Sequence, residues 1–172
     1  MKHTGDYRRL FFACWPDQAV RRELIERRGL IQGLSRRQVP DHNLHLTLLF
    51  LGNQPAESVD EIQGVASEIS CQSFDLVLDR FGWFPGARVA WLGGPAPPAA
   101  LALVADLTAA MHRLGLIFDG RAFHPHVTLF RQVAARPAFP QPPQLDWPIH
   151  EFALIESIPS APYQVLRKWC VV

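Results

Sequence analysis

Several short stretches of the chain either alternate apolar and polar residues or are continuously apolar, a pattern typical of β-strands in half-buried or buried sheets. Pro85-Gly86 separates two of them and predicts a hairpin. Prolines are frequent in residues 137–148, which we expect to form a loop. The predicted strands are residues 8–15, 44–51, 74–81, 88–92, 123–131, 151–158 and 163–171.

Three further stretches space their apolar residues three or four positions apart, as amphipathic helices do. The first covers residues 17–34, where Asp17 follows a proline and is expected to cap the helix. The second begins at Pro55, a favourable first position for a helix, and the third covers residues 101–114. The sequence therefore predicts a protein that mixes strands and helices.

Two of the predicted strands contain the same motif, His-x-Thr-Leu, at residues 45–48 and 126–129. Because side chains alternate along a strand, its imidazole and hydroxyl face the same side, about 6.5 Å apart. The chain has seven His and few Thr, so two such coincidences have odds of roughly 0.01 by chance. The alternative interpretation is that both histidines are half-buried strand residues with satisfied hydrogen bonds.

The order of elements predicts an α+β fold with mainly antiparallel sheets and helices outside them. Each motif strand follows a helix, which indicates a diverged duplication with pseudo-twofold symmetry around a central cleft. The length of 172 residues suits one domain, or two small lobes that share a core.

The repeated residues suit acid–base chemistry on a phosphate. An imidazole with an ordinary pKa of about 6.5 gives or takes a proton near neutral pH. His45 and His126 on opposite sides of a phosphorus atom would serve in-line displacement from both ends. Thr47 and Thr128 would donate hydrogen bonds to the non-bridging oxygens. Arg131 lies three residues after Thr128, so strict alternation puts it on the opposite face unless a strand end or bulge returns it.

Composition and charge indicate the cellular compartment and the kinds of partner to expect. No apolar run is long enough for a membrane span, and three widely spaced Cys offer no paired metal-ligand spacing. We therefore expect a cytoplasmic protein that does not enter a membrane. The net charge is +1, but residues 1–40 carry nine Lys and Arg against four Asp and Glu. This basic segment predicts either attraction to a polyanion or a solvated helix face.

With both motifs in place, nearly the whole chain resembles the 2H phosphoesterase superfamily, which is named for two His-x-Thr/Ser motifs. Within it, the chain is most similar to the RNA 2′,3′-cyclic phosphodiesterases, also called 2′-5′ RNA ligases. The similar blocks occur in the family's order. They are residues 9–13 (RLFFA), 43–48 (NLHLTL), 50–52 (FLG), 88–93 (RVAWLG), 125–131 (PHVTLFR) and 163–169 (YQVLRKW).

The resemblance implies that residues 1–172 form one domain of two intertwined lobes, with a cleft between two sheets. It implies hydrolysis of RNA 2′,3′-cyclic phosphate ends, including those of tRNA fragments, to 2′-phosphates, with reversible 2′-5′ ligation as a second activity. His45 would donate a proton to the 3′-oxygen and His126 would accept one from water. The family also carries a basic residue at Arg131. No metal or other cofactor and a monomeric state are expected.

Other interpretations remain open. His42, His45, His124 and His126 could in principle gather around zinc, although His42 and His45 have opposite strand parity. The cleft could bind RNA ends without catalysis, or the substrate could be a small cyclic nucleotide such as ADP-ribose 1″,2″-cyclic phosphate. Phe11 or Phe12 could stack on the terminal base, although core packing is the usual fate of such aromatics. We expect His42 and His124 to be peripheral.

Overall fold

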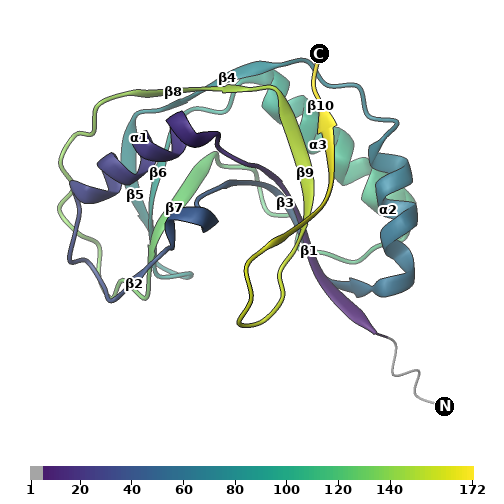
Figure 1. Ribbon diagram of the computed structural model, residues 1–172, viewed down its shortest axis with the longest axis horizontal. Helices are drawn as coiled ribbons and strands as arrows, with labels where there is room; N and C mark the ends of the chain where they lie inside the picture. Colours follow the sequence, from purple (N-terminus) through teal and green to yellow (C-terminus); the bar gives the residue numbers. More distant parts are fainter. Residues whose placement is uncertain (1–5) are drawn as a thin grey trace.

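The computed structural model describes residues 6–172 (Figure 1). Strands predominate, and three α-helices and two short 3₁₀ helices connect them. The strands are β1 (Tyr7–Cys14), β2 (Arg37–Gln38), β3 (Leu46–Pro55), β4 (Phe74–Leu78), β5 (Arg80–Phe84), β6 (Val89–Gly93), β7 (His126–Arg131), β8 (Leu145–Ile149), β9 (Glu151–Glu156) and β10 (Gln164–Cys170). The helices are α1 (Gln18–Gly29), η1 (Asp41–Asn43), η2 (Ala56–Ser58), α2 (Val59–Ala66) and α3 (Pro98–Arg113).

Eight strands form one antiparallel sheet in the order β10-β9-β1-β3-β7-β6-β5, with β2 beside β7. Its two halves meet where β3 and β7 share a single residue pair, Leu46 with Val127. We call β10, β9, β1 and β3 the first half, and β7, β6, β5 and β2 the second half. Figure 1 shows the first half together with α2 and α3, and the second half on the opposite side of the molecule. The α+β class with antiparallel sheets is confirmed.

Helices α1 and α3 pack on strands through apolar faces. Val20 and Leu24 of α1 are buried, and α1 packs on β8. Asp17 caps α1 as predicted, because its Oδ1 accepts a hydrogen bond from the Val20 amide at 2.8 Å. Helix α3 packs on β3 and α2 and buries Leu103 and Leu107. No helix described in residues 6–172 has the length and apolar character needed to cross a membrane.

The predicted hairpin is wrong in its first strand. Residues 74–81 do not form one strand beside residues 88–92, because the chain leaves strand geometry at Asp79. Strand β5, which follows Asp79, pairs with β6, whereas β4 pairs with β8 in a separate two-stranded sheet. The turn at Pro85-Gly86 is correctly placed between β5 and β6.

The Pro-rich region was wrongly expected to be a loop throughout, since β8 covers residues 145–149. Alternate side chains of β8, those of Leu145, Trp147 and Ile149, are buried, and this burial holds the strand in place. Pro148 is tolerated because β8 pairs with β4 alone, so its other edge needs no backbone donor.

Several boundaries also differ from the predictions. Helix α1 ends at Gly29 instead of residue 34, and β7 begins at residue 126 instead of 123. Strand β3 continues to Pro55, because Gly52 adopts φ +69° at an irregularity in the pairing with β1 and does not end the strand. The helix expected from Pro55 begins as the 3₁₀ turn η2 before α2.

Candidate active site

The two motifs face each other across the junction of the two halves of the sheet. Leu46 and Val127, the middle residues of the motifs, are direct partners in an antiparallel pair. Antiparallel pairing at this point sets each motif histidine opposite the threonine of the other motif. An approximate two-fold axis therefore runs through the Leu46–Val127 pair, and the four polar side chains surround it.

A bulge follows the threonine in each motif strand. Strand β1 pairs with β3 on both sides of Leu48 but not at Leu48 itself, and β6 pairs with β7 on both sides of Leu129 but not at it. Each bulge shifts the alternation of side chains by one residue. It therefore returns Phe50 and Arg131, each three residues after its threonine, to the face that carries the histidines. This explains how Arg131 reaches the site despite its parity.

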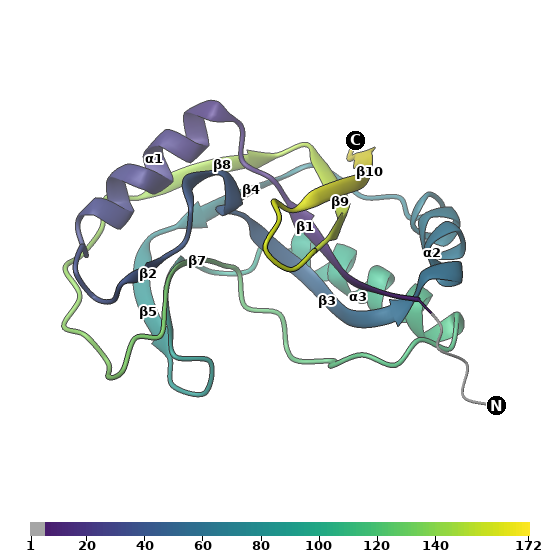
Figure 2. The ribbon, with the colours of Figure 1, turned by 60° about the horizontal axis from the view of Figure 1, so that its bottom comes forward.

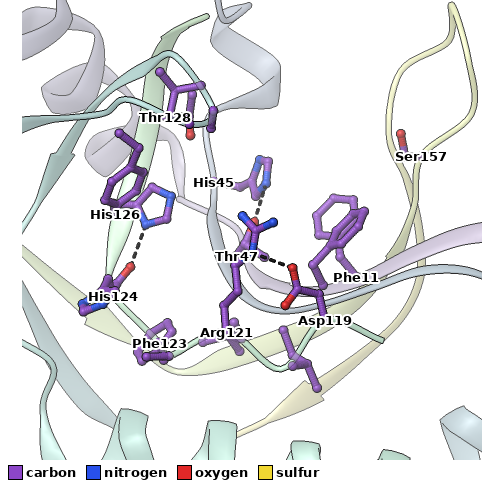
Figure 3. A pocket seen from close by; sticks show the side chains of 18 of the residues that line it. Phe11, His45, Thr47, Asp119, Arg121, Phe123, His124, His126, Thr128 and Ser157 are labelled. Carbon is purple, nitrogen blue, oxygen red and sulfur yellow. Dashed lines mark hydrogen bonds and ion pairs between the residues drawn. The ribbon is translucent and has the colours of Figure 1, made fainter. Parts of the chain in front are cut away.

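A cavity of about 960 Å³ lies over this junction (Figure 3). The structure brings all five predicted site residues to its wall: His45, Thr47, His126, Thr128 and Arg131. Other parts of its wall come from β1, from the turn between β5 and β6, and from the segment between α3 and β7. The cavity is therefore built from both halves of the sheet.

Both imidazoles are oriented by the backbone in the same way. The Nδ1 of His45 lies 2.6 Å from the carbonyl oxygen of Asn43, and the Nδ1 of His126 lies 2.6 Å from that of His124. A carbonyl only accepts, so Nδ1–H donates in both rings. Each Nε2 is then the nitrogen that accepts or releases a proton during a reaction.

The two histidines differ in their contact with threonine. The Nε2 of His45 lies 3.1 Å from Oγ1 of Thr47, whose hydroxyl donates to the neutral imidazole. Within residues 6–172, no such hydrogen bond joins His126 to Thr128 (Figure 3). The local two-fold symmetry therefore does not extend to the hydrogen bonds of the site.

Three aromatic rings enclose His45. Trp15 stacks on it at 5.1 Å with an interplanar angle of 2°, Phe11 lies at 5.2 Å, and the Tyr163 ring meets it edge-on at 5.5 Å. Burial lowers the pKa of His45, the hydrogen bond to the Asn43 carbonyl raises it, and the charges of Arg131 and His126 lower it; together these effects bring the pKa to about 4. His45 is therefore neutral at pH 7 in the free protein.

His126 has a different aromatic environment. Phe84 meets its ring edge-on at 5.0 Å, and Trp91 lies 6.1 Å away. Burial lowers the pKa of His126, while its hydrogen bond to the His124 carbonyl raises it and the neighbouring His124 charge lowers it. Both histidines thus favour the neutral form when the cavity holds no anion.

Two glycines make room for Trp91 beside His126. A Cβ added at Gly82, the cross-strand partner of Trp91, would meet the indole at 2.1 Å. A Cβ at Gly93, the partner of His126, would lie 2.7 Å from the indole and 2.6 Å from the Pro125 carbonyl oxygen. The indole therefore lies flat over positions where other residues would project side chains.

The described part of the chain has no preformed site for the zinc ion considered above. No group of three or more His, Cys, Asp or Glu side chains in residues 6–172 is placed to share a metal ion. His42 belongs to η1 and does not line the cavity. His124 does line it, and its carbonyl orients His126, so the expectation that His124 is peripheral is wrong.

The sequence did not indicate several residues of the site. Trp15, Phe84 and Trp91 contact the histidines, and Arg9 lines the cavity with its guanidinium 4.8 Å from the centre of the Phe50 ring. Only Arg9 had a signal in the sequence, because it is the cation that begins the apolar "RLFFA" strand. The contacts of Trp15, Phe84 and Trp91 depend on the order of strands in the sheet, which cannot be deduced from the sequence.

The two adjacent phenylalanines of β1 have different environments. Phe11 lines the cavity, yet only 3% of it is exposed, and it packs on His45 and Tyr163. Phe12 lies on the other side, fully buried against Phe152 and Trp169. Neither is free to offer an open stacking face, so Phe11 positions the histidine and Phe12 belongs to the core.

Comparisons with known proteins identify the family of the chain. The family model of the 2′-5′ RNA ligase superfamily matches residues 16–158. The chain is 35% identical to the RNA 2′,3′-cyclic phosphodiesterase of Escherichia coli, over 95% of this chain and 96% of the relative. It is 32% identical to the protein of the same name from Thermus thermophilus, over 94% and 89%.

A solved structure shows the same likeness. The crystal structure of E. coli LigT complexed with 3′-AMP superposes with a TM-score of 0.88 at 32% identity, covering 96% of this chain and 99% of that one. The resemblance that the two motifs indicated is thus confirmed by sequence and by fold. The chain belongs to the 2′-5′ RNA ligase superfamily of 2H phosphoesterases, a family with cyclic phosphodiesterase activity.

Proposed function

We propose that the protein hydrolyses the 2′,3′-cyclic phosphate at an RNA end to a 2′-phosphate, with two histidines as acid and base and no metal ion. The pairing of Leu46 with Val127 carries this proposal, because it brings both His-x-Thr motifs to the wall of one cavity. The relatives named RNA 2′,3′-cyclic phosphodiesterase support the choice of substrate.

In the proposed reaction, Nε2 of His126 accepts a proton from water as the water oxygen bonds to phosphorus. The bond from phosphorus to the 3′-oxygen breaks, and Nε2–H of His45 protonates that oxygen. The product carries a 2′-phosphate, and the two histidines exchange protonation states. An RNA 5′-hydroxyl in place of water would form a 2′-5′ linkage by the same displacement, which is the proposed ligation.

The acid role requires His45 to be protonated, although its pKa is about 4 in the free protein. A bound phosphodiester supplies the missing stabilisation, because a negative charge close to the ring favours the imidazolium and raises its pKa. Protonation also turns Nε2 from an acceptor into a donor. The hydroxyl of Thr47 is then released from His45 and is available to a non-bridging oxygen.

Arg131 and Thr128 complete the anion site in this proposal. A guanidinium on the cavity wall donates charge-assisted hydrogen bonds to phosphate oxygens. The Thr128 hydroxyl is a second neutral donor for the charge that builds up in the transition state. Each donor of this kind contributes about 3 to 4 kcal/mol to transition-state stabilisation in other enzymes.

The test is hydrolysis of a short RNA with a 2′,3′-cyclic phosphate end, in the presence of a chelator, by the wild type, His45→Ala and His126→Ala. We expect a 2′-phosphate product from the wild type only. Loss of wild-type activity in chelator would disprove the metal-free mechanism, and full activity of either variant would disprove the two-histidine mechanism. Parallel assays with ADP-ribose 1″,2″-cyclic phosphate test the small-nucleotide alternative.

A further inference from the structure

Three arginines come from backbone segments that meet beside β7: Arg37 in β2, Arg131 in β7 itself, and Arg88 just before β6. Figure 2 shows β2 beside β7. Arg37 of β2 is the direct cross-strand partner of Arg131 in β7. Partners in an antiparallel pair project side chains from the same face of the sheet. Since Arg131 lines the cavity, Arg37 projects from the face that carries the cavity.

Arg88 joins these two from the other side of β7. Its carbonyl oxygen accepts a hydrogen bond from the Val133 amide at 2.9 Å, so its backbone lies beside the end of β7. Arg88 also has φ +54°, a left-handed conformation that residues with a Cβ rarely adopt. We call Arg37, Arg88 and Arg131 the arginine cluster.

The cluster lacks counter-charges within residues 6–172. Other arginines pair with carboxylates, as Arg8 does with Glu156 and Arg121 with Asp119, but no cluster member takes part in an ion pair among the described residues. All three are exposed. Adjacent like charges repel, which is a cost to the folded protein that a bound polyanion would relieve.

The rest of the basic N-terminal segment behaves differently. The side chains of Arg27 and Arg28 are buried, and they bind the carbonyls of Pro143, Gln144 and Val39. These two arginines therefore fasten loops to α1 and are not available to a ligand. The described arginines of this segment therefore differ in their surroundings: Arg27 and Arg28 are structural, whereas Arg9 lines the cavity and Arg37 pairs with a strand residue of its wall. Arg22 is exposed on α1 and does not line the cavity.

We propose that Arg37 and Arg88 bind the phosphates of nucleotides upstream of the cyclic end, so that the preferred substrate is an RNA of several nucleotides and not a mononucleotide. This inference rests on the proposed function, because it places the cyclic phosphate beside Arg131. Arg131 contacts the reacting group, and Arg37 and Arg88 extend the positive surface away from it along the RNA backbone.

The experiment measures kcat and KM for a nucleoside 2′,3′-cyclic phosphate and for an RNA of about ten nucleotides with the same end. The proteins are the wild type, Arg37→Gln/Arg88→Gln and the control Arg22→Gln. Arg22 is exposed on α1 and does not line the cavity. For the double variant we expect KM for the long RNA to rise about tenfold, with kcat and the mononucleotide reaction unchanged.

Salt dependence gives a second readout. The slope of log(kcat/KM) against log[salt] for the long RNA is negative, and each lost phosphate contact makes it less steep by about 0.7. An unchanged KM for the long RNA, an equal loss with the mononucleotide, or an equal loss in Arg22→Gln would overturn the proposal.

Failure of the proposed function is recognised separately, as a wild type that hydrolyses neither substrate. The cluster is then tested by fluorescence anisotropy with a labelled RNA of the same length that lacks the cyclic end. Binding that is about tenfold weaker in the double variant, and unchanged in Arg22→Gln, supports the surface even then. Equal binding by all three proteins would overturn it.

Discussion

The indole of Trp91 covers Gly82 so closely that a methyl group on that glycine would lie 2.1 Å from the ring. Trp91 in turn lies 5.0 Å from Phe84 and 6.1 Å from His126. Gly82 therefore fixes the position of Trp91, and Trp91 in turn packs near His126, a proposed catalytic residue.

We expect Gly82→Ala to displace Trp91 and with it His126. Forcing a methyl group into a packed site costs about 1 to 3 kcal/mol of stability. We also expect kcat for the cyclic phosphate to fall at least about tenfold, because misplaced catalytic groups lose rate steeply. Urea unfolding and steady-state kinetics measure the two effects. The control is Gly64→Ala, where an added Cβ meets nothing within 4 Å, and equal kcat in both variants would contradict the prediction.

Replacing a site threonine by valine removes a hydroxyl and keeps the shape of the side chain. We expect Thr47→Val and Thr128→Val each to lower kcat by about 10²-fold, as the loss of other oxyanion donors does. KM should change little if the hydroxyls act mainly in the transition state. Thr108→Val serves as the control, since Thr108 binds the Val104 carbonyl within α3, remote from the cavity. If Thr108→Val lost as much activity as the site variants, the loss would reflect general destabilisation and the prediction would be wrong.

The lowered pKa of His45 makes stability depend on pH. The unfolded chain binds more protons than the folded protein between pH of about 6.5, the ordinary value, and about 4. The free energy of unfolding should therefore decrease as the pH falls through this window, by up to about 1.4 kcal/mol per pH unit for this group. Urea unfolding at several pH values should show a shallower decrease for His45→Gln, and an unchanged slope would refute the assignment.

Arg131 should contribute, after burial, to the lowered pKa of His45. Its positive charge is one of the causes that lower the pKa of His45, so Arg131→Gln should raise that pKa toward its ordinary value. Adding inorganic phosphate to the wild type should raise it as well, because an anion favours the imidazolium. Nuclear magnetic resonance titration of the imidazole follows both changes. Arg22→Gln is the matched control, and the same pKa with and without Arg131 would show that this charge does not reach the ring.

Much of the site was predictable because its chemistry lies in local repeats. Alternation in a strand places His45 with Thr47, and His126 with Thr128, whatever the strand order is. The position of Arg131 depended on a bulge at Leu129, which the sequence allowed but did not require. Tyr163 was assigned only to a closing strand, and its contact with His45 arises from the order β9-β1-β3.

The errors in the fold also have physical causes. Proline usually marks a loop, but β8 needs donors on one edge only and gains from burying Trp147. Glycine usually ends a strand, but at Gly52 the pairing with β1 continues past an irregularity. In both cases pairing with a neighbouring strand outweighed the local conformational preference of the proline or glycine.

The bulges at Leu48 and Leu129 turn two chemically different side chains to the face that carries the histidines. At the equivalent positions beyond them, one half of the sheet presents the ring of Phe50 and the other presents the cation of Arg131. A ligand bound at the histidines therefore meets an aromatic ring on one flank and a positive charge on the other.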